Sequence, residues 1–251
     1  MRGMDDLARG ELKFYQADIN SAEFFINGAM NQGRENKQLL TVQMALFYTL
    51  RIAVFQGNCE KAEQALKEME FFIRGSEFPP CFICYGIAFA WYACIPGLPE
   101  NIPHWLRGRF SSYGHASFME NFENQAKARY CYISKNYAPL LAYIEEQKKR
   151  ESVLFGRLEM LVMEACIHYK MRDKRKACEL LSRAYAVAHP NNLLMPFIEF
   201  GKDMRTLTAF ALREYDCGIP RPWLELVNSK AVSYARRQAH LLRTAMERKI
   251  I

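Results

Sequence analysis

The sequence predicts an all-α protein in which helical hairpins stack into an α-α superhelix. Three observations predict this fold class. Half of the 251 residues are hydrophobic, which is enough for a large core. Proline and glycine are sparse and fall mostly at expected corners, while the alternating pattern of a half-buried strand is almost absent. The third observation is a corner motif that recurs along the chain.

The corner motif is a tight turn followed, at helical spacing, by mostly small residues around a larger one. Small residues at these positions let two antiparallel helices approach closely. The clean copies are Ala17-Asp18 with Ala22, Ile26 and Ala29; Gly57-Asn58 with Ala62, Leu66 and Met69; and Arg172-Asp173 with Ala177, Leu181 and Ala184. Weaker copies are centred on Gly97 and Lys135.

These corners recur about every 40 residues, somewhat more than the roughly 34 residues of a tetratricopeptide repeat. We therefore expect residues 1–251 to form a single helical-repeat domain of the tetratricopeptide-like kind. Within it, residues 1–192 make about five helix-turn-helix repeats, and residues 193–251 make C-terminal capping helices that cover the open end of the stack.

The expected helices follow from apolar residues at helical spacing and from the prolines and glycines between them. Pro79-Pro80 breaks the chain before an apolar helix, and His189-Pro190 closes the last clear repeat. In order, we expect helices at 4–16, 19–32, 36–56, 60–73, 81–94, a short one around Trp105, 118–134, 136–147, 153–171, 174–188, 203–215 and 220–249.

The eight cysteines mostly lie on apolar helical faces, so we expect buried, reduced thiols. The pair Cys81-x-x-Cys84 has no second ligand pair at zinc spacing and no βαβ context for redox chemistry, which leaves core packing as its expected role. No metal site is expected.

The net charge of +7 is concentrated near the end of the chain. Residues 218–251 carry seven Lys or Arg and two Glu, a net of +5. A basic last helix can face nucleic acid, but no base-reading pattern accompanies the cations. A solvated helix with cations near its negative C-terminal end is the favoured interpretation.

The sequence indicates neither a membrane protein nor an enzyme. No apolar run reaches the roughly 20 residues of a membrane span, and no signal peptide is evident, so a cytoplasmic location is expected. None of the five histidines lies in a nucleophile or metal motif, and we expect no catalytic residues and no cofactor.

In stacked hairpins the first helix of each pair lines the concave face. Counting back from each corner places aromatic and basic side chains there, a combination that can hold a peptide, an anionic ligand or a sugar. The candidate ligand- or partner-binding residues are Tyr15, Phe47, Arg51, Phe55, Arg129, Tyr132, Tyr169 and Lys170. Arg51 and Arg129 are the strongest candidates, because a charge on an apolar helix face needs a reason. The alternative is that the aromatic side chains pack between helices.

One segment resembles a known family. Residues 184–207 combine an Ala-rich helix with Pro196, Phe197, Glu199 and Gly201, followed by Met204 and Leu207. This stretch, and a piece at 102–106, resemble the tetratricopeptide-like region of bacterial LuxR-family transcriptional regulators related to the maltose activator MalT. In that family the region receives inducers or partner proteins.

The resemblance implies the sensor or scaffold region of such a regulator, present as a fragment. The G-x-x-x-x-G-K-[ST] loop of the family's nucleotide-binding module is not found, nor is its helix-turn-helix module. The implied partners are a small-molecule effector, a protein or peptide, or a second copy of the chain, with DNA bound only through a domain outside this sequence. A freestanding adaptor that docks a peptide is the alternative.

Overall fold

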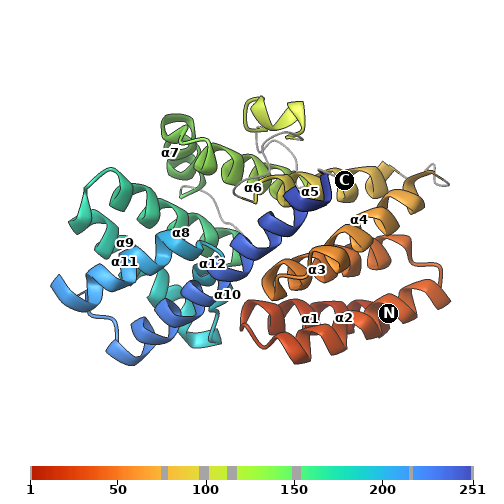
Figure 1. Cartoon of the computed structure of the whole chain (residues 1–251), viewed down its shortest axis with the longest axis horizontal. Helices are drawn as coiled ribbons and strands as arrows, with labels where there is room; N and C mark the ends of the chain where they lie inside the picture. The colour runs from red at the N-terminus through yellow and green to blue at the C-terminus, as the bar shows by residue number, and fades with distance from the viewer. Residues whose placement is uncertain are drawn as a thin grey trace. The chain divides into compact units, whose positions relative to one another are not determined.

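A computed structural model describes residues 2–74, 79–95, 102–111, 118–148, 154–214 and 217–249 (Figure 1). These residues form helices and no strand, which confirms the all-α fold class. The helices are α1 (Arg2–Tyr15), α2 (Ile19–Glu35), α3 (Leu39–Gln56), α4 (Cys59–Arg74), α5 (Pro79–Ala93), η2 (His104–Arg107), α6 (Phe118–Ile133), α7 (Tyr137–Gln147), α8 (Leu154–Lys170), α9 (Lys174–Ala188), η3 (His189–Asn191), α10 (Met195–Ile198), α11 (Gly201–Glu214) and α12 (Arg221–Lys249).

Four of the five predicted corners are confirmed as left-handed turns between two helices. Their φ angles are +60° at Ala17, +76° at Gly57, +59° at Lys135 and +68° at Arg172. At the first corner the Asp18 amide donates to the Lys13 carbonyl at 3.0 Å, and the same six-residue closure recurs at the other three. This bond satisfies a carbonyl that a helix end otherwise leaves without a partner. The fifth corner, Gly97, lies outside the described residues.

A further corner of the same kind was not predicted. Lys37 has a φ of +55°, and the Gln38 amide donates to the Gly33 carbonyl at 2.7 Å. The expectation of one helix from residue 36 to 56 was therefore wrong at its start, because α3 begins at Leu39. Residues 34–40 include neither glycine nor proline, so no local breaker marked the position of the turn.

The small residues behind the corners do what the motif predicts. Ala22, Ala62 and Ala177 are fully buried. A glycine allows a still closer approach of α1 and α2, since a Cβ on Gly10 would lie 2.6 Å from the Ile26 Cδ1 atom. The pairs α1/α2, α3/α4 and α8/α9 each pack as a hairpin.

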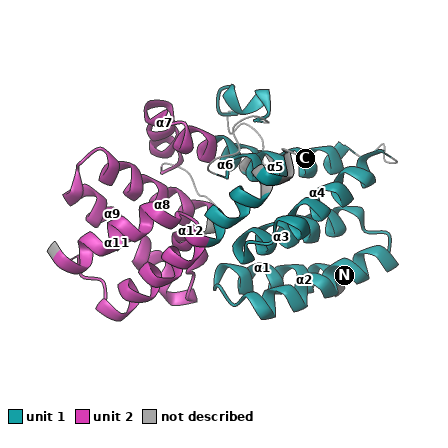
Figure 2. Ribbon diagram, in the orientation of Figure 1, with its two compact units in different colours: residues 1–127, 237–251 teal, residues 128–236 magenta. Residues whose placement is uncertain are grey.

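The chain divides into two compact units, coloured separately in Figure 2. Unit 1 consists of residues 1–127 and 237–251, and unit 2 consists of residues 128–236. In unit 1, α3 packs against α1, α2, α4 and α5. In unit 2, α8 packs against α7, α9, α10 and α11. A single domain and a superhelical stack remain predictions.

Helix α12 supplies residues to both units. In unit 2, the indole of Trp223 lies edge-on to Phe197, with ring centroids 4.9 Å apart. In unit 1, the Arg237 guanidinium lies 5.0 Å from the centroid of the Phe55 ring and donates to the Phe55 carbonyl at 3.1 Å. Trp223, near the start of α12, and Arg237, near its middle, therefore each make an aromatic contact within their own unit.

Helix α3 is the one helix, among the residues that the structure describes, that is long and apolar enough to span a membrane. However, 72% of it is buried inside the protein and it carries the buried Arg51. Burial of this kind is typical of the core helix of a soluble protein.

Candidate functional site

The side chain of Arg51 lies in a cage of aromatic rings in unit 1. The residue is 5% exposed. Its guanidinium carbon lies 4.6 Å from the Phe14 ring centroid and 5.4 Å from that of Tyr15, whose hydroxyl accepts from Nη1 at 3.4 Å. The rings of Phe47, Tyr48 and Trp91 complete the cage at 5.6 to 5.8 Å. Desolvated cation–π contacts stabilise a guanidinium that water no longer reaches.

A carboxylate on α1 accompanies this cage. The Tyr48 hydroxyl, on α3, donates a hydrogen bond to Glu11. Burial raises the pKa of Glu11, while the Tyr48 hydrogen bond and the Arg51 charge oppose that rise. Burial likewise raises the pKa of Tyr48 well above its ordinary value, so its hydroxyl stays protonated and remains a donor. The charge on Arg51 is thus matched by groups inside unit 1.

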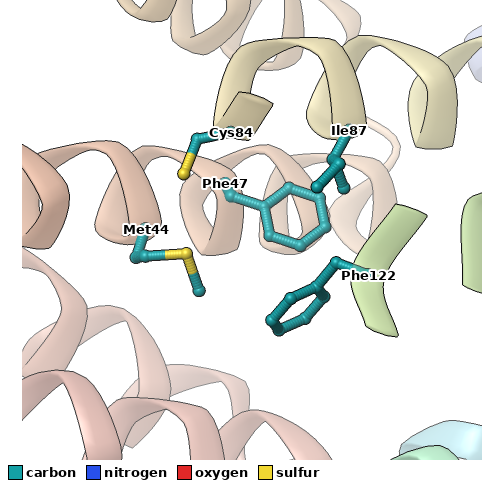
Figure 3. Close-up of a pocket in the computed structure, with 5 residues that line it drawn as sticks. All are labelled: Met44, Phe47, Cys84, Ile87 and Phe122. Atoms are coloured by element: carbon teal, nitrogen blue, oxygen red, sulfur yellow. The ribbon is translucent and has the colours of Figure 1, made fainter. Parts of the chain in front are cut away.

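An apolar pocket lies beside the cage, with Phe47 belonging to both. Its lining side chains come from α3, α5 and α6 and converge on one space (Figure 3): Met44, Phe47, Cys84, Ile87 and Phe122. The Phe47 ring is perpendicular to Phe122, with centroids 6.5 Å apart. Burial, and secondarily Cys81, raise the pKa of the Cys84 thiol to about 12, so the pocket carries no charge near neutral pH.

The pocket is small. Its cavity is about 10 Å³, room for roughly one water molecule. A sugar or nucleotide needs a pocket of about 300 Å³ or more. The pocket as it stands is therefore too small for a whole small molecule, and its lining is apolar.

In unit 2 the structure gives Arg129 two acidic partners. The guanidinium contacts Glu159 at 2.8 Å and Glu199 at 2.5 Å. The side chains of the two glutamates are 7% and 2% exposed, and that of Arg129 is 17% exposed. This network joins α6, α8 and the segment after α10, and it neutralises the charge of Arg129 within unit 2.

A second polar cluster in unit 2 contains Tyr132, Lys170 and Asp203. The Tyr132 hydroxyl donates to the Asp203 carboxylate at 2.5 Å, and the Lys170 ammonium contacts the same oxygen at 2.9 Å. The ammonium also lies 5.3 Å from the Tyr132 ring centroid. Tyr169 points elsewhere, toward Phe210, with ring centroids 5.7 Å apart.

The structure brings the predicted site residues together in groups. Tyr15, Phe47 and Arg51 share the aromatic cage, and Tyr132 and Lys170 share the Asp203 cluster. Phe55, Arg129 and Tyr169 each contact other residues. Sequence reasoning did not select Met44, Ile87 or Phe122, although Met44 precedes Phe47 by three residues on one face of α3 and so offered a signal.

Comparison with known proteins adds no family. No protein-family model and no curated protein matches the sequence. Within the part of the chain that the structure describes, no three His, Cys, Asp or Glu side chains gather as metal ligands. Seven of the eight cysteines are buried free thiols, and Cys217 is partly exposed.

Proposed function

We propose that the protein is a binding and signalling module that docks a partner protein on the apolar face formed by α3 and α5 in unit 1. We propose further that this module is the sensor or scaffold region of a bacterial LuxR-family transcriptional regulator, working in the cytoplasm. It does so without catalysis.

The observation that carries the proposal is the apolar pocket and the surface around it. Helices α3 and α5 carry a single charged residue between them, the buried Arg51. Leu40 and Ile83, from the same two helices, are 38% and 43% exposed. Uncharged, partly exposed apolar surface is characteristic of a protein-docking face.

The size of the pocket and the pairing of the charges favour a protein partner over a small effector. A pocket that accepts one apolar side-chain end can anchor a peptide or a helix laid across α3 and α5. Arg51 and Arg129, the residues best suited to an anionic effector, already have partners within their own units. An effector would have to compete with those contacts.

The assignment to a regulator rests on the resemblance of residues 184–207. In unit 2 this stretch forms a corner. Two of the residues that carry the resemblance make contacts there: Phe197 packs against Trp223, and Glu199 binds Arg129. Reading the coding sequence beyond codon 251 tests the assignment. An encoded helix-turn-helix module supports it, whereas an immediate stop codon favours the freestanding adaptor.

Photo-cross-linking in living cells tests the docking face. A photoreactive amino acid at Met44, in the pocket, should give a defined protein adduct that is lost when Phe122 is changed to Asp. The matched control is the same amino acid at Phe24, which is 73% exposed on α2. Equal adducts at both positions, or an adduct at Met44 that survives Phe122→Asp, would argue against the proposal.

A further inference from the structure

Three exposed cations are close in sequence to the Tyr132–Lys170–Asp203 cluster of unit 2. They are Lys135, Arg172 and Lys202. Each lies within three residues of a cluster member, and none has an acidic partner among the described residues. We call Lys135, Lys170, Arg172, Lys174 and Lys202 the basic corner surface.

The contacts of this surface show that its cations come from adjacent elements. Lys170 reaches from α8 to Asp203 on α11, and Lys174 at the start of α9 lies 4.6 Å from the Phe210 ring centroid on α11. The amides of Lys135 and Arg172 donate to the carbonyls of Tyr132 and Tyr169, at 3.2 and 3.1 Å. The backbone at Lys135 and at Arg172 is therefore fixed by a closed turn.

The charge of the surface is strongly positive. The five cations are accompanied in the sequence by two acids, Asp173 and Asp203, so this set of residues carries a net charge of +3. Both acids are engaged: Asp203 binds Tyr132 and Lys170, and the Asp173 carboxylate caps α9 by accepting from the Lys176 amide at 3.1 Å. Lys135, Arg172 and Lys202 remain available to an anionic ligand.

We propose that the basic corner surface binds an acidic segment of a protein partner. Lys135, Arg172 and Lys202 supply the free charges, and Lys170 and Lys174 hold their neighbours in place. Single-stranded nucleic acid is the other anionic candidate, but it binds through aromatic faces on which bases stack. Here the Lys170 ammonium lies over the Tyr132 ring and the Lys174 ammonium over the Phe210 ring, so a cation occupies the ring face on which a base would stack. The choice of a protein as the source of the anion rests on the proposed function. The arrangement of the cations is independent of that function.

The test measures fluorescence anisotropy with two labelled probes. One is a twelve-residue peptide of alternating Glu and Gly, and the other is a twelve-nucleotide oligo-dT. The variant is Lys135→Asn/Arg172→Asn/Lys202→Gln, in which asparagine suits the left-handed φ at positions 135 and 172. The control is Lys37→Asn/Lys67→Gln/Arg107→Gln in unit 1, which removes the same charge from exposed residues and also changes one left-handed corner.

We expect the peptide to bind the wild-type protein and the control equally, and the variant about tenfold or more weakly. Salt should weaken the wild-type binding, since exposed charges are screened. Met44→Asp should leave it unchanged, which separates this site from the docking face of unit 1. The proposal is overturned if the peptide does not bind, if the variant and the control lose affinity alike, or if only oligo-dT binds.

Discussion

The guanidinium of Arg129 contacts the carboxylate of Glu199 at 2.5 Å, although the two residues lie 70 positions apart in the sequence. Glu159 completes the network at 2.8 Å. Both carboxylates are almost fully buried, and both contact the same guanidinium. Arg129 is therefore expected to act first on the stability of unit 2.

Replacing Arg129 by Met should destabilise the protein by about 3–5 kcal/mol, because it leaves two buried carboxylates without their cation. The measurement is the free energy of unfolding in urea. Arg175→Met is the control, because that side chain is 82% exposed in its pair with Glu179 and should cost less than about 0.5 kcal/mol. Adding Glu159→Gln and Glu199→Gln to Arg129→Met should recover part of the loss. Equal stability of the two single variants would contradict the account.

Replacing Glu11 by Gln should change how stability depends on pH. Burial raises the pKa of Glu11, so the folded state holds its proton more tightly than the unfolded state does. The stability that this gives is fully present below about pH 4.3, the ordinary value for glutamate, and is lost as the pH rises through the raised pKa. Glutamine keeps an acceptor for Tyr48 but does not titrate.

The stability of Glu11→Gln relative to the wild-type protein should therefore increase from pH 4 to pH 8. Urea midpoints at a series of pH values check this. Asp18 and Glu23 have lowered pKa values, but they are present in both proteins and cancel in the difference. A difference that does not change with pH would show that Glu11 is ionised in the folded state as easily as in the unfolded one.

Replacing Ala17 by Gly should stabilise the protein by about 0.5–1 kcal/mol. Ala17 has a φ of +60°, a conformation that costs a residue with a Cβ about 1–2 kcal/mol and glycine almost nothing. The same substitution at Ala8, exposed within α1, should instead destabilise by about 0.5–1 kcal/mol. Thermal unfolding of both variants gives the direction of each change in stability. Shifts of the unfolding temperature in the same direction would refute this role for the corner.

Replacing Gly57 by Ala should destabilise the protein by about 1–2 kcal/mol or more. The φ of Gly57 is +76°, and a Cβ there would lie 3.2 Å from the Arg237 Cβ atom and 3.4 Å from its carbonyl oxygen. Gly86→Ala, inside α5, is the matched control. A Cβ at Gly86 meets nothing within 4 Å, so alanine should stabilise by about 1 kcal/mol. Tolerance of Gly57→Ala would contradict the close approach of α12 to this corner.

The sequence was most informative about the corners and least about the partners of buried charges. Ala17, Gly57 and Arg172 were found because a local motif follows each of them. Lys37, whose turn is also left-handed, was missed because residues 34–40 contain no glycine or proline. Arg51 and Arg129 stood out as charges on apolar faces, but Glu11, Glu159 and Glu199 come from other parts of the chain, which local patterns cannot pair.

The pocket illustrates the same limit. The apolar character of α3 and α5 was legible in the sequence, and residues 81–94 were expected to form an apolar helix. Which residues of those helices meet depends on the register between them. The meeting of Met44, Ile87 and Phe122 around Phe47 could therefore be read only from the structure.

The most direct test of the proposed function compares transcripts in the organism that encodes the protein. One strain carries Met44→Asp on the chromosome, a second carries Phe24→Asp as the exposed control, and a third lacks the gene. With protein levels matched, we predict that Met44→Asp changes the same transcripts as the deletion, while Phe24→Asp resembles the wild type. A wild-type transcript profile in the Met44→Asp strain, or in the strain that lacks the gene, would contradict the account.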